Sequence, residues 1–116
     1  MDKQRTSTQL GAYGEERAAT YLKEKGYKII DRNWKTRYCE IDIIATKKKR
    51  VYFYEVKYRA SPNQGKGFEY VTPTKLTQMS FAAHMWVRDH SYKGDFQLGV
   101  VSVDGDAIEV IDEIWQ

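Results

Sequence analysis

The stretch CEIDIIATKKKRVYFYEVKYR, residues 39–59, contains two β-strand patterns joined by a run of basic residues. Residues that favour strands (Ile, Val, Tyr and Phe) are concentrated at 40–46 and 51–58. Four charged side chains interrupt these runs: Glu40, Asp42, Glu55 and Lys57. Because like charges held close together destabilise a sheet, the three acids need a compensating positive charge.

The length of the turn decides whether these charges share one face of the sheet. Side chains alternate faces along a strand, so Glu40 lies with Asp42, and Glu55 lies with Lys57. A two-residue turn at Lys48-Lys49 would place Asp42 opposite Glu55. The same turn would place Glu40 opposite Lys57, and a four-residue turn would preserve the shared face. A three-residue turn would put the two pairs on different faces.

The remaining sequence predicts an α/β domain with a mixed central sheet flanked by helices. Gly26 is a helix stop signal, and Thr72-Pro73 is a helix start signal. Asp104-Gly105 is typical of a hairpin turn. The predicted helices are 8–25 and 73–89, and the predicted strands are 27–33, 40–46, 51–58, 96–103 and 107–111. The element order is therefore α-β-β-β-α-β-β.

Size and composition predict one domain over residues 1–116. The chain is 41% hydrophobic and 30% charged, which provides enough apolar residues for a core. Its length of 116 residues is too short for two domains. We expect 1–7 to be flexible and 61–70, with its Pro and Gly residues, to be a mobile loop. There is no apolar run of roughly 18 residues and no secretory signal pattern, which excludes a membrane-spanning protein. With a single cysteine, Cys39, these features predict a cytoplasmic protein.

The acids and the lysine suggest a metal site with hydrolytic chemistry. Carboxylates that share a face suit Mg²⁺, which binds one or two of them and keeps room for water and phosphate oxygens; Ca²⁺ stays open on ligand type alone. Lys57 beside such a site can orient an attacking water, as phosphodiester hydrolysis requires. The alternative is a salt-bridged sheet surface, with Glu40 and Lys57 as a cross-strand ion pair.

Basic residues provide candidate contacts for a nucleic-acid backbone. The net charge of +3 permits a polyanionic partner without requiring one. The predicted contacts, for which simple solvation is the alternative, are Lys48, Lys49, Arg59, Lys66 and Lys75. Lys75 falls in the first turn of the second predicted helix, where a helix N-terminus favours phosphate. We expect Tyr52, Tyr54 and Tyr58, on the strand face opposite Glu55, to pack beneath a helix.

Several ordered motifs resemble known nucleases. Asp42 followed by Glu55-Val56-Lys57, after a helix with Glu15, resembles the PD-(D/E)XK superfamily, whose restriction endonuclease-like core is shared by archaeal Holliday-junction resolvases. Over most of its length the chain is similar to the YraN-like family of small bacterial proteins regarded as endonucleases. The matching segments are Gly11-x-x-Gly14-Glu15-x-x-Ala18, Asn33-Trp34, Glu40-Ile41-Asp42-Ile43-Ile44-Ala45, Glu55-Val56-Lys57-x-Arg59 and Val71-Thr72-x-x-Lys75.

The resemblance implies a role for each matching residue. Asp42, Glu55 and the main-chain carbonyl of Val56 would bind Mg²⁺, or Mn²⁺ in its place, and Lys57 would position the water. Glu15, in preference to its neighbour Glu16, would assist through water or a second ion. Glu40 matches the family's accessory acid. Two positions depart from the family pattern: Cys39 replaces the usual Gly, and Gln97 replaces the acid of an Arg-Phe-Asp motif.

The sequence therefore predicts a Mg²⁺-dependent endonuclease that hydrolyses DNA, with branched DNA as a candidate substrate. RNA stays open as a substrate, and so does a homodimer. The alternative function is a module that keeps the nuclease fold and binds nucleic acid or a protein without cleaving.

Overall fold

A computed structural model describes residues 7–59, 72–112 and 114, with side chains from residue 11 onward. Two helices and five strands follow the predicted order. They are α1 (Ser7–Glu24), β1 (Lys28–Lys35), β2 (Glu40–Lys47), β3 (Arg50–Arg59), α2 (Pro73–Asp89), β4 (Phe96–Asp104) and β5 (Ala107–Ile111). The predicted loop at 61–70, with Lys66, lies outside the described residues, as does almost all of 1–7.

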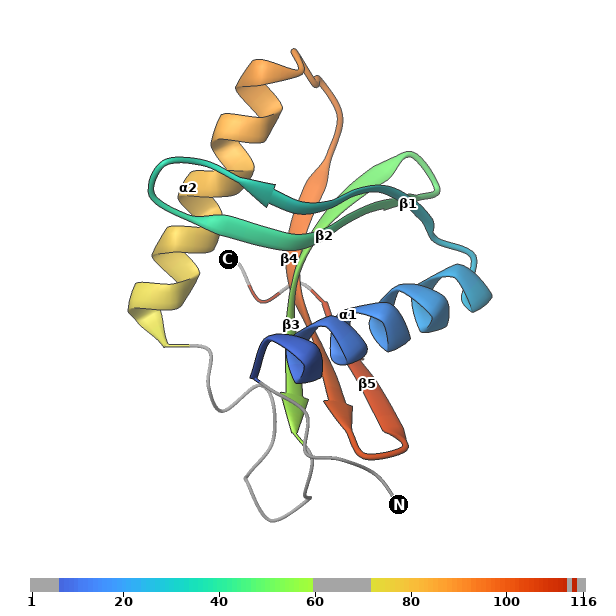
Figure 1. Cartoon of the computed structure of the whole chain (residues 1–116). Coiled ribbons are helices and arrows are strands. Elements are labelled where there is room, and N and C mark those ends of the chain that lie inside the picture. Colours follow the sequence, from blue (N-terminus) through green and yellow to red (C-terminus); the bar gives the residue numbers. More distant parts are fainter. Residues whose placement is uncertain (1–6, 60–71, 113, 115–116) are drawn as a thin grey trace.

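The strands form one mixed sheet in the order β1-β2-β3-β4-β5. β3 and β4 are parallel, and the other three neighbouring pairs are antiparallel. The parallel pair needs a crossover connection, which α2 supplies. Figure 1 shows α1 crossing over β3, while α2 lies beside the β1–β2 hairpin.

The two helices cover opposite faces of the sheet with separate apolar cores. On the α1 face the buried residues are Ala18, Ala19, Leu22, Ile43, Ala45, Tyr54, Val101 and Val103. On the α2 face they are Ile41, Ile44, Val51, Phe53, Met79, Ala82, Ala83, Trp86 and Leu98. Tyr52 and Tyr58 pack against the α1 core, so the prediction that these tyrosines lie beneath a helix is confirmed.

The β2–β3 turn has the two-residue length on which the shared face depends. Lys47 pairs with Arg50, and Lys48 and Lys49 between them have φ values of 53° and 67°. Positive φ at both turn residues is the geometry that matches the twist of a tight hairpin. The register continues to Ile43 opposite Tyr54, so the next residues along, Asp42 and Glu55, point to the same face.

The helix signals are confirmed, and one predicted turn is displaced by one residue. At the start of α2, the Thr72 hydroxyl accepts a hydrogen bond from the Lys75 amide at 3.1 Å. Just after α1, Gly26 has a φ of 95°. The β4–β5 turn consists of Gly105 and Asp106, whereas Asp104-Gly105 was predicted. Asp104 stays in the strand because it pairs with both Ala107 and Arg59.

Gly14 allows α1 to approach β3 closely. A Cβ at this position would lie 2.7 Å from the Tyr58 Cβ and 3.1 Å from its Cγ. Both atoms are near the backbone, so Tyr58 cannot move away without shifting the strand. The absence of a side chain at Gly14 therefore sets the distance between the helix and the sheet.

We expect Gly14→Ala to destabilise the protein by about 1–3 kcal/mol through overpacking. Gly11→Ala is the matched control, because a Cβ there has no neighbour within 4 Å. That control should stabilise the helix by up to about 1 kcal/mol. Urea unfolding of both variants measures the difference, and equal stabilisation by the two changes would show that α1 does not pack closely at Gly14.

Candidate metal-binding and catalytic site

The candidate site lies where β2 and β3 separate. Their pairing ends at Ile43 and Tyr54. Beyond this point Glu40 pairs with Lys35 of β1, whereas Glu55 pairs with Val100 of β4. Figure 1 shows the two strands diverging after their paired segment. We call this place the fork.

Asp42 connects the two sides of the fork. Its Oδ2 accepts a hydrogen bond from the Val56 amide at 2.8 Å. A side-chain carboxylate of β2 therefore binds the backbone of β3 just past the last backbone pair. This contact holds Asp42 beside Glu55 and orients its second oxygen away from the Val56 amide.

Glu55 is buried and contacts two lysines. Only 8% of the residue is exposed. Its Oε2 lies 3.2 Å from the Lys57 ammonium, and its Oε1 lies 3.3 Å from the Lys75 ammonium. A buried carboxylate is costly unless it is paired, and here each oxygen has a cation. Lys57 comes from the same strand and Lys75 from the first turn of α2.

The environment of Asp42 raises its pKa from 3.8 to about 7. Burial is the largest cause, and the negative charge of Glu55 is the next. The hydrogen bond from the Val56 amide lowers the pKa, while Glu15 and Glu40 raise it further. Burial and the charges of the neighbouring acids therefore both favour the protonated form of Asp42.

Glu15 approaches the fork from α1, as predicted. Burial raises the pKa of Glu15, and the charges of Glu40 and Glu55 add to this effect. Hydrogen bonding to the Asn33 side chain and the charge of Arg32 oppose it. The neighbouring acid, Glu16, instead forms an exposed ion pair with Arg32 at 2.9 Å. Glu15 is thus the acid of this pair that interacts electrostatically with Asp42 and Glu55.

The donor atoms suit a cation that needs few protein ligands. Among the described residues, no three His, Cys, Asp or Glu side chains lie close enough to hold a metal by themselves. Zinc sites generally require such a set. Mg²⁺ does not, because it binds through one or two carboxylates and completes its shell with water and phosphate oxygens. Asp42 and Glu55 fit that requirement. Burial is the main reason that the pKa of Asp42 is raised, and the neighbouring negative charge, which a cation would offset, is the second.

The other predicted basic contacts lie in different places. Arg59 is 5% exposed and forms a two-pronged ion pair with Asp104, so its phosphate contact stays a prediction. This pair joins the ends of β3 and β4. Lys48 and Lys49 are at the hairpin tip, at the opposite end of the paired segment from the fork, about 16 Å along the strand at roughly 3.3 Å per residue.

Glu40 and Lys57 do not pair as the salt-bridge alternative required. The ion pairs of the described residues match Lys57 with Glu55. Glu40 is exposed and acts on the fork through its charge. Lys75, which was predicted as a phosphate contact, is bound to Glu55 in the structure. The only sequence signal for this contact was its position in a helix start.

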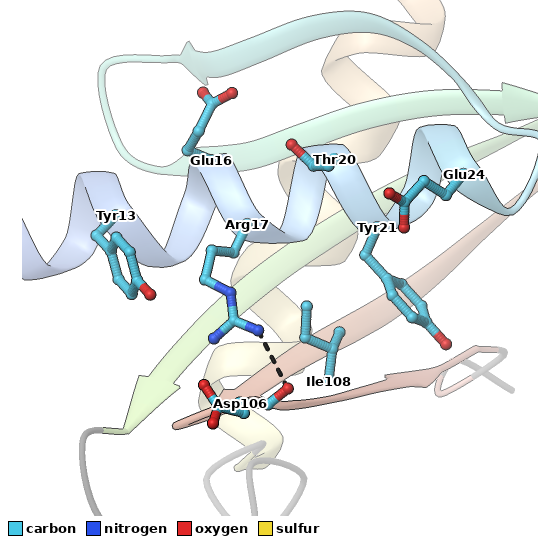
Figure 2. A pocket seen from close by; sticks show the side chains of 8 residues that line it. All are labelled: Tyr13, Glu16, Arg17, Thr20, Tyr21, Glu24, Asp106 and Ile108. Carbon is cyan, nitrogen blue, oxygen red and sulfur yellow. Dashed lines mark hydrogen bonds between the residues drawn. The ribbon is translucent and has the colours of Figure 1, made fainter.

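A separate hollow of about 390 Å³ lies between α1 and β5. Its lining includes Tyr13, Arg17, Tyr21 and Ile108, and none of the predicted site residues. Figure 2 shows Arg17 reaching from α1 to the Asp106 carbonyl, 3.1 Å away. This hydrogen bond from Arg17 attaches the β4–β5 turn to α1 beside the hollow.

Within the described residues, neither helix is long and apolar enough to cross a membrane.

Comparison with known proteins identifies similar chains. A family model described as "Uncharacterised protein family UPF0102" matches residues 14–110. A UPF0102 protein of Sulfurihydrogenibium sp. is 37% identical over 109 residues, covering 93% of this chain and 91% of its own. A UPF0102 protein of Syntrophomonas wolfei is 45% identical over 80 residues, covering 69% of this chain and 70% of its own. One from Cytophaga hutchinsonii is 34% identical over 102 residues, with coverage of 88% and 90%.

We predict that Asp42 makes stability fall as pH rises. The folded-state pKa of about 7 exceeds the ordinary value of 3.8, so the folded state holds the proton more tightly. The stabilisation is complete below about pH 4 and is lost as pH rises through 7. When the pH rises from 5 to 8.5, the free energy of unfolding of Asp42→Asn should therefore increase by about 2–3 kcal/mol relative to that of the wild type.

Urea unfolding at the two pH values, without divalent cations, measures this gain. Glu24→Gln, which neutralises an exposed acid of α1, controls for the loss of one negative charge. If the free energy of unfolding depends on pH in the same way in Asp42→Asn and Glu24→Gln, the pKa of Asp42 is not raised in the folded state.

Proposed function

The chain belongs to the UPF0102 family, which the YraN-like motifs predicted, and we propose that it is a metal-dependent endonuclease of the PD-(D/E)XK type. The observation that carries the proposal is the fork. Side chains from two neighbouring strands, Asp42 of β2 and Glu55 and Lys57 of β3, lie together where the two strands part. Glu15 adds a fourth charge from a different element.

The proposed cofactor is Mg²⁺, with Mn²⁺ able to replace it. Asp42 and Glu55 would hold the ion, joined by the Val56 carbonyl, and Glu15 would act through water. When bound, Mg²⁺ lowers the pKa of water and offsets negative charge that develops on the phosphate. Glu55 is available as a ligand only if at least one of its two lysines releases it.

The residues of the chain supply the remaining chemistry. The Lys57 ammonium, 3.2 Å from Glu55, would donate a hydrogen bond to one lone pair of the attacking water and leave the other lone pair free to attack phosphorus. As the new P–O bond forms, the bond to the leaving sugar oxygen breaks; the attacking water gives up a proton to solvent, and the leaving oxygen takes a proton from solvent. Lys75, once released by Glu55, can bind a phosphate oxygen, which restores its predicted role as a backbone contact.

The proposed substrate is DNA, with branched DNA as the candidate structure. RNA and a homodimeric form belong to the same proposal as alternatives to be tested. A second candidate function is a non-cleaving module that binds nucleic acid or a protein. The observation that favours it is the charge balance of Glu55, whose two oxygens are already paired with ammonium groups.

We expect Asp42→Ala and Lys57→Ala each to reduce Mg²⁺-dependent cleavage by about 100-fold or more. Glu15→Gln should also lower the rate, whereas Glu16→Gln should not, because Glu16 is paired with Arg32 and is not among the acids that raise the pKa of Asp42. Lys23→Ala, an exposed lysine of the last turn of α1, is the control for the loss of a positive charge. The assay compares single-stranded, duplex, flap and four-way DNA with Mg²⁺ and with Mn²⁺.

Calorimetric titration with Mn²⁺ separates the two candidate functions. The nuclease requires an affinity for Mn²⁺ that Asp42→Ala removes. Retention of full cleavage by Asp42→Ala or Lys57→Ala would refute the catalytic assignment. Nucleic-acid binding without any metal affinity at the fork would instead support the non-cleaving module.

A further inference from the structure

Two exposed aromatic side chains contact each other on the α2 side of the molecule. Tyr38 is 72% exposed and Phe81 is 48% exposed, the highest values among the large hydrophobic residues whose side chains are described. Their rings lie 6.4 Å apart at 68°, an edge-to-face contact. Single exposed aromatics are ordinary, but two in contact make an apolar patch, which is typical of a binding surface.

The backbone holds Tyr38 in this exposed position. Tyr38 lies in the turn between β1 and β2. There the Thr36 hydroxyl accepts hydrogen bonds from the backbone amides of Tyr38, at 3.1 Å, and Cys39, at 2.9 Å. The Thr36 amide in turn donates to the Cys39 carbonyl at 2.8 Å. The turn is therefore fixed by its own hydrogen bonds, and Phe81 is fixed by α2. A ring carried by a fixed backbone loses less freedom when it binds a flat partner than a ring on a mobile loop.

The surroundings of the aromatic pair are basic. Lys35 and Arg37 are exposed in and beside the same turn. α2 contains no acid from Pro73 to Arg88, and it carries Lys75. The nearest acid along the chain, Glu40, belongs to the fork. These charges favour a polyanionic partner over a basic or neutral one.

The pair lies close to the fork. Tyr38 precedes Asp42 by four residues, a path of at most about 13 Å at roughly 3.3 Å per residue. Phe81 belongs to the helix whose Lys75 contacts Glu55. A hollow of about 420 Å³, lined by Leu76, Thr77, Ser80 and Phe81, extends from the ring along α2. A strand bound at the fork would thus have its next few nucleotides beside the two rings.

We propose that Tyr38 and Phe81 form a stacking site for an unpaired base of the nucleic-acid strand bound at the fork. The inference rests on the nucleic-acid binding of the proposed function and adds its substrate class. Bases inside a continuous duplex already stack on each other and cannot reach a ring at the surface. An unpaired base can, because every base has a flat face that stacks on an aromatic side chain. The preferred substrate therefore carries unpaired nucleotides next to the cleaved phosphate, as a flap or gap does.

Binding of two fluorescent DNAs by the full chain tests this proposal. One is a blunt duplex, and the other has the same duplex with a single-stranded flap carrying 2-aminopurine near the junction. Ca²⁺ replaces Mg²⁺ so that binding is read without turnover, and a gel confirms that the DNA is intact. Tyr38→Ala and Phe81→Ala remove the rings, Tyr38→Trp keeps a stacking surface, and Tyr21→Ala removes a tyrosine from the opposite side of the sheet as control. Thermal unfolding verifies that each variant is folded.

The wild type should bind the flap more tightly than the duplex and quench the 2-aminopurine. Tyr38→Ala should reduce flap affinity about tenfold, with little effect on the duplex. Tyr38→Trp should restore both the affinity and the quenching, and Tyr21→Ala should match the wild type. Mn²⁺ affinity at the fork should be unchanged in all four variants.

Other outcomes overturn the proposal in distinguishable ways. If the wild type binds DNA but Tyr38→Ala and Phe81→Ala bind the flap equally well, the stacking site is wrong and the proposed nuclease stands. If the wild type binds neither DNA, both proposals fall, and the aromatic pair would then suit a protein partner. If the ring-dependent flap preference is present but no cleavage occurs with Mg²⁺ or Mn²⁺, the stacking site stands and the catalytic assignment falls.

Discussion

The two-residue turn at Lys48 and Lys49 is the constraint on which the rest of the site depends. Both residues adopt a positive φ, which costs an ordinary residue about 1–2 kcal/mol. The turn is maintained because its register buries Ile44 and Phe53 on the α2 face and Ile43 and Tyr54 on the α1 face. A turn longer by one residue would send Asp42 and Glu55 to opposite faces. The packing of two hydrophobic cores therefore determines the geometry of a charged site.

The fork gathers charge that the fold alone would not favour. β2 turns toward β1 while β3 continues beside β4, and this divergence makes room for side chains from α1 and α2. Glu55 is paired with Lys57 and Lys75, whereas burial, helped by the charges of Glu55, Glu15 and Glu40, raises the pKa of Asp42 to about 7. Sites that perform chemistry commonly contain such perturbed groups. A divalent metal ion would relieve the repulsion between the acids. If the ion displaced Lys75 from Glu55, the Lys75 ammonium would become available to bind a phosphate.

The sequence predicted the features that depend on local rules. Strand alternation made the shared face of Asp42, Glu55 and Lys57 depend on the turn length alone, and the structure supplies the two-residue turn at Lys48 and Lys49. The cap at Thr72 and the stop at Gly26 followed from backbone chemistry. The contacts of Lys75 and Arg59 could not be predicted, because each joins β3 to an element brought close only by the crossover through α2. For the same reason the sequence did not show that Arg59, a predicted phosphate contact, is buried against Asp104. The Tyr38–Phe81 contact likewise joins a turn and a helix more than forty residues apart.

The claim that the fork is a divalent-metal site is tested most directly by crystals of the full chain soaked in Mn²⁺. The account predicts an anomalous scattering peak between the carboxylates of Asp42 and Glu55, with the Lys75 ammonium moved away from Glu55. Crystals of Asp42→Asn should lack that peak under the same conditions. A map without a peak at the fork, with Glu55 still bound to both lysines at an Mn²⁺ concentration that supports DNA cleavage, would contradict the account.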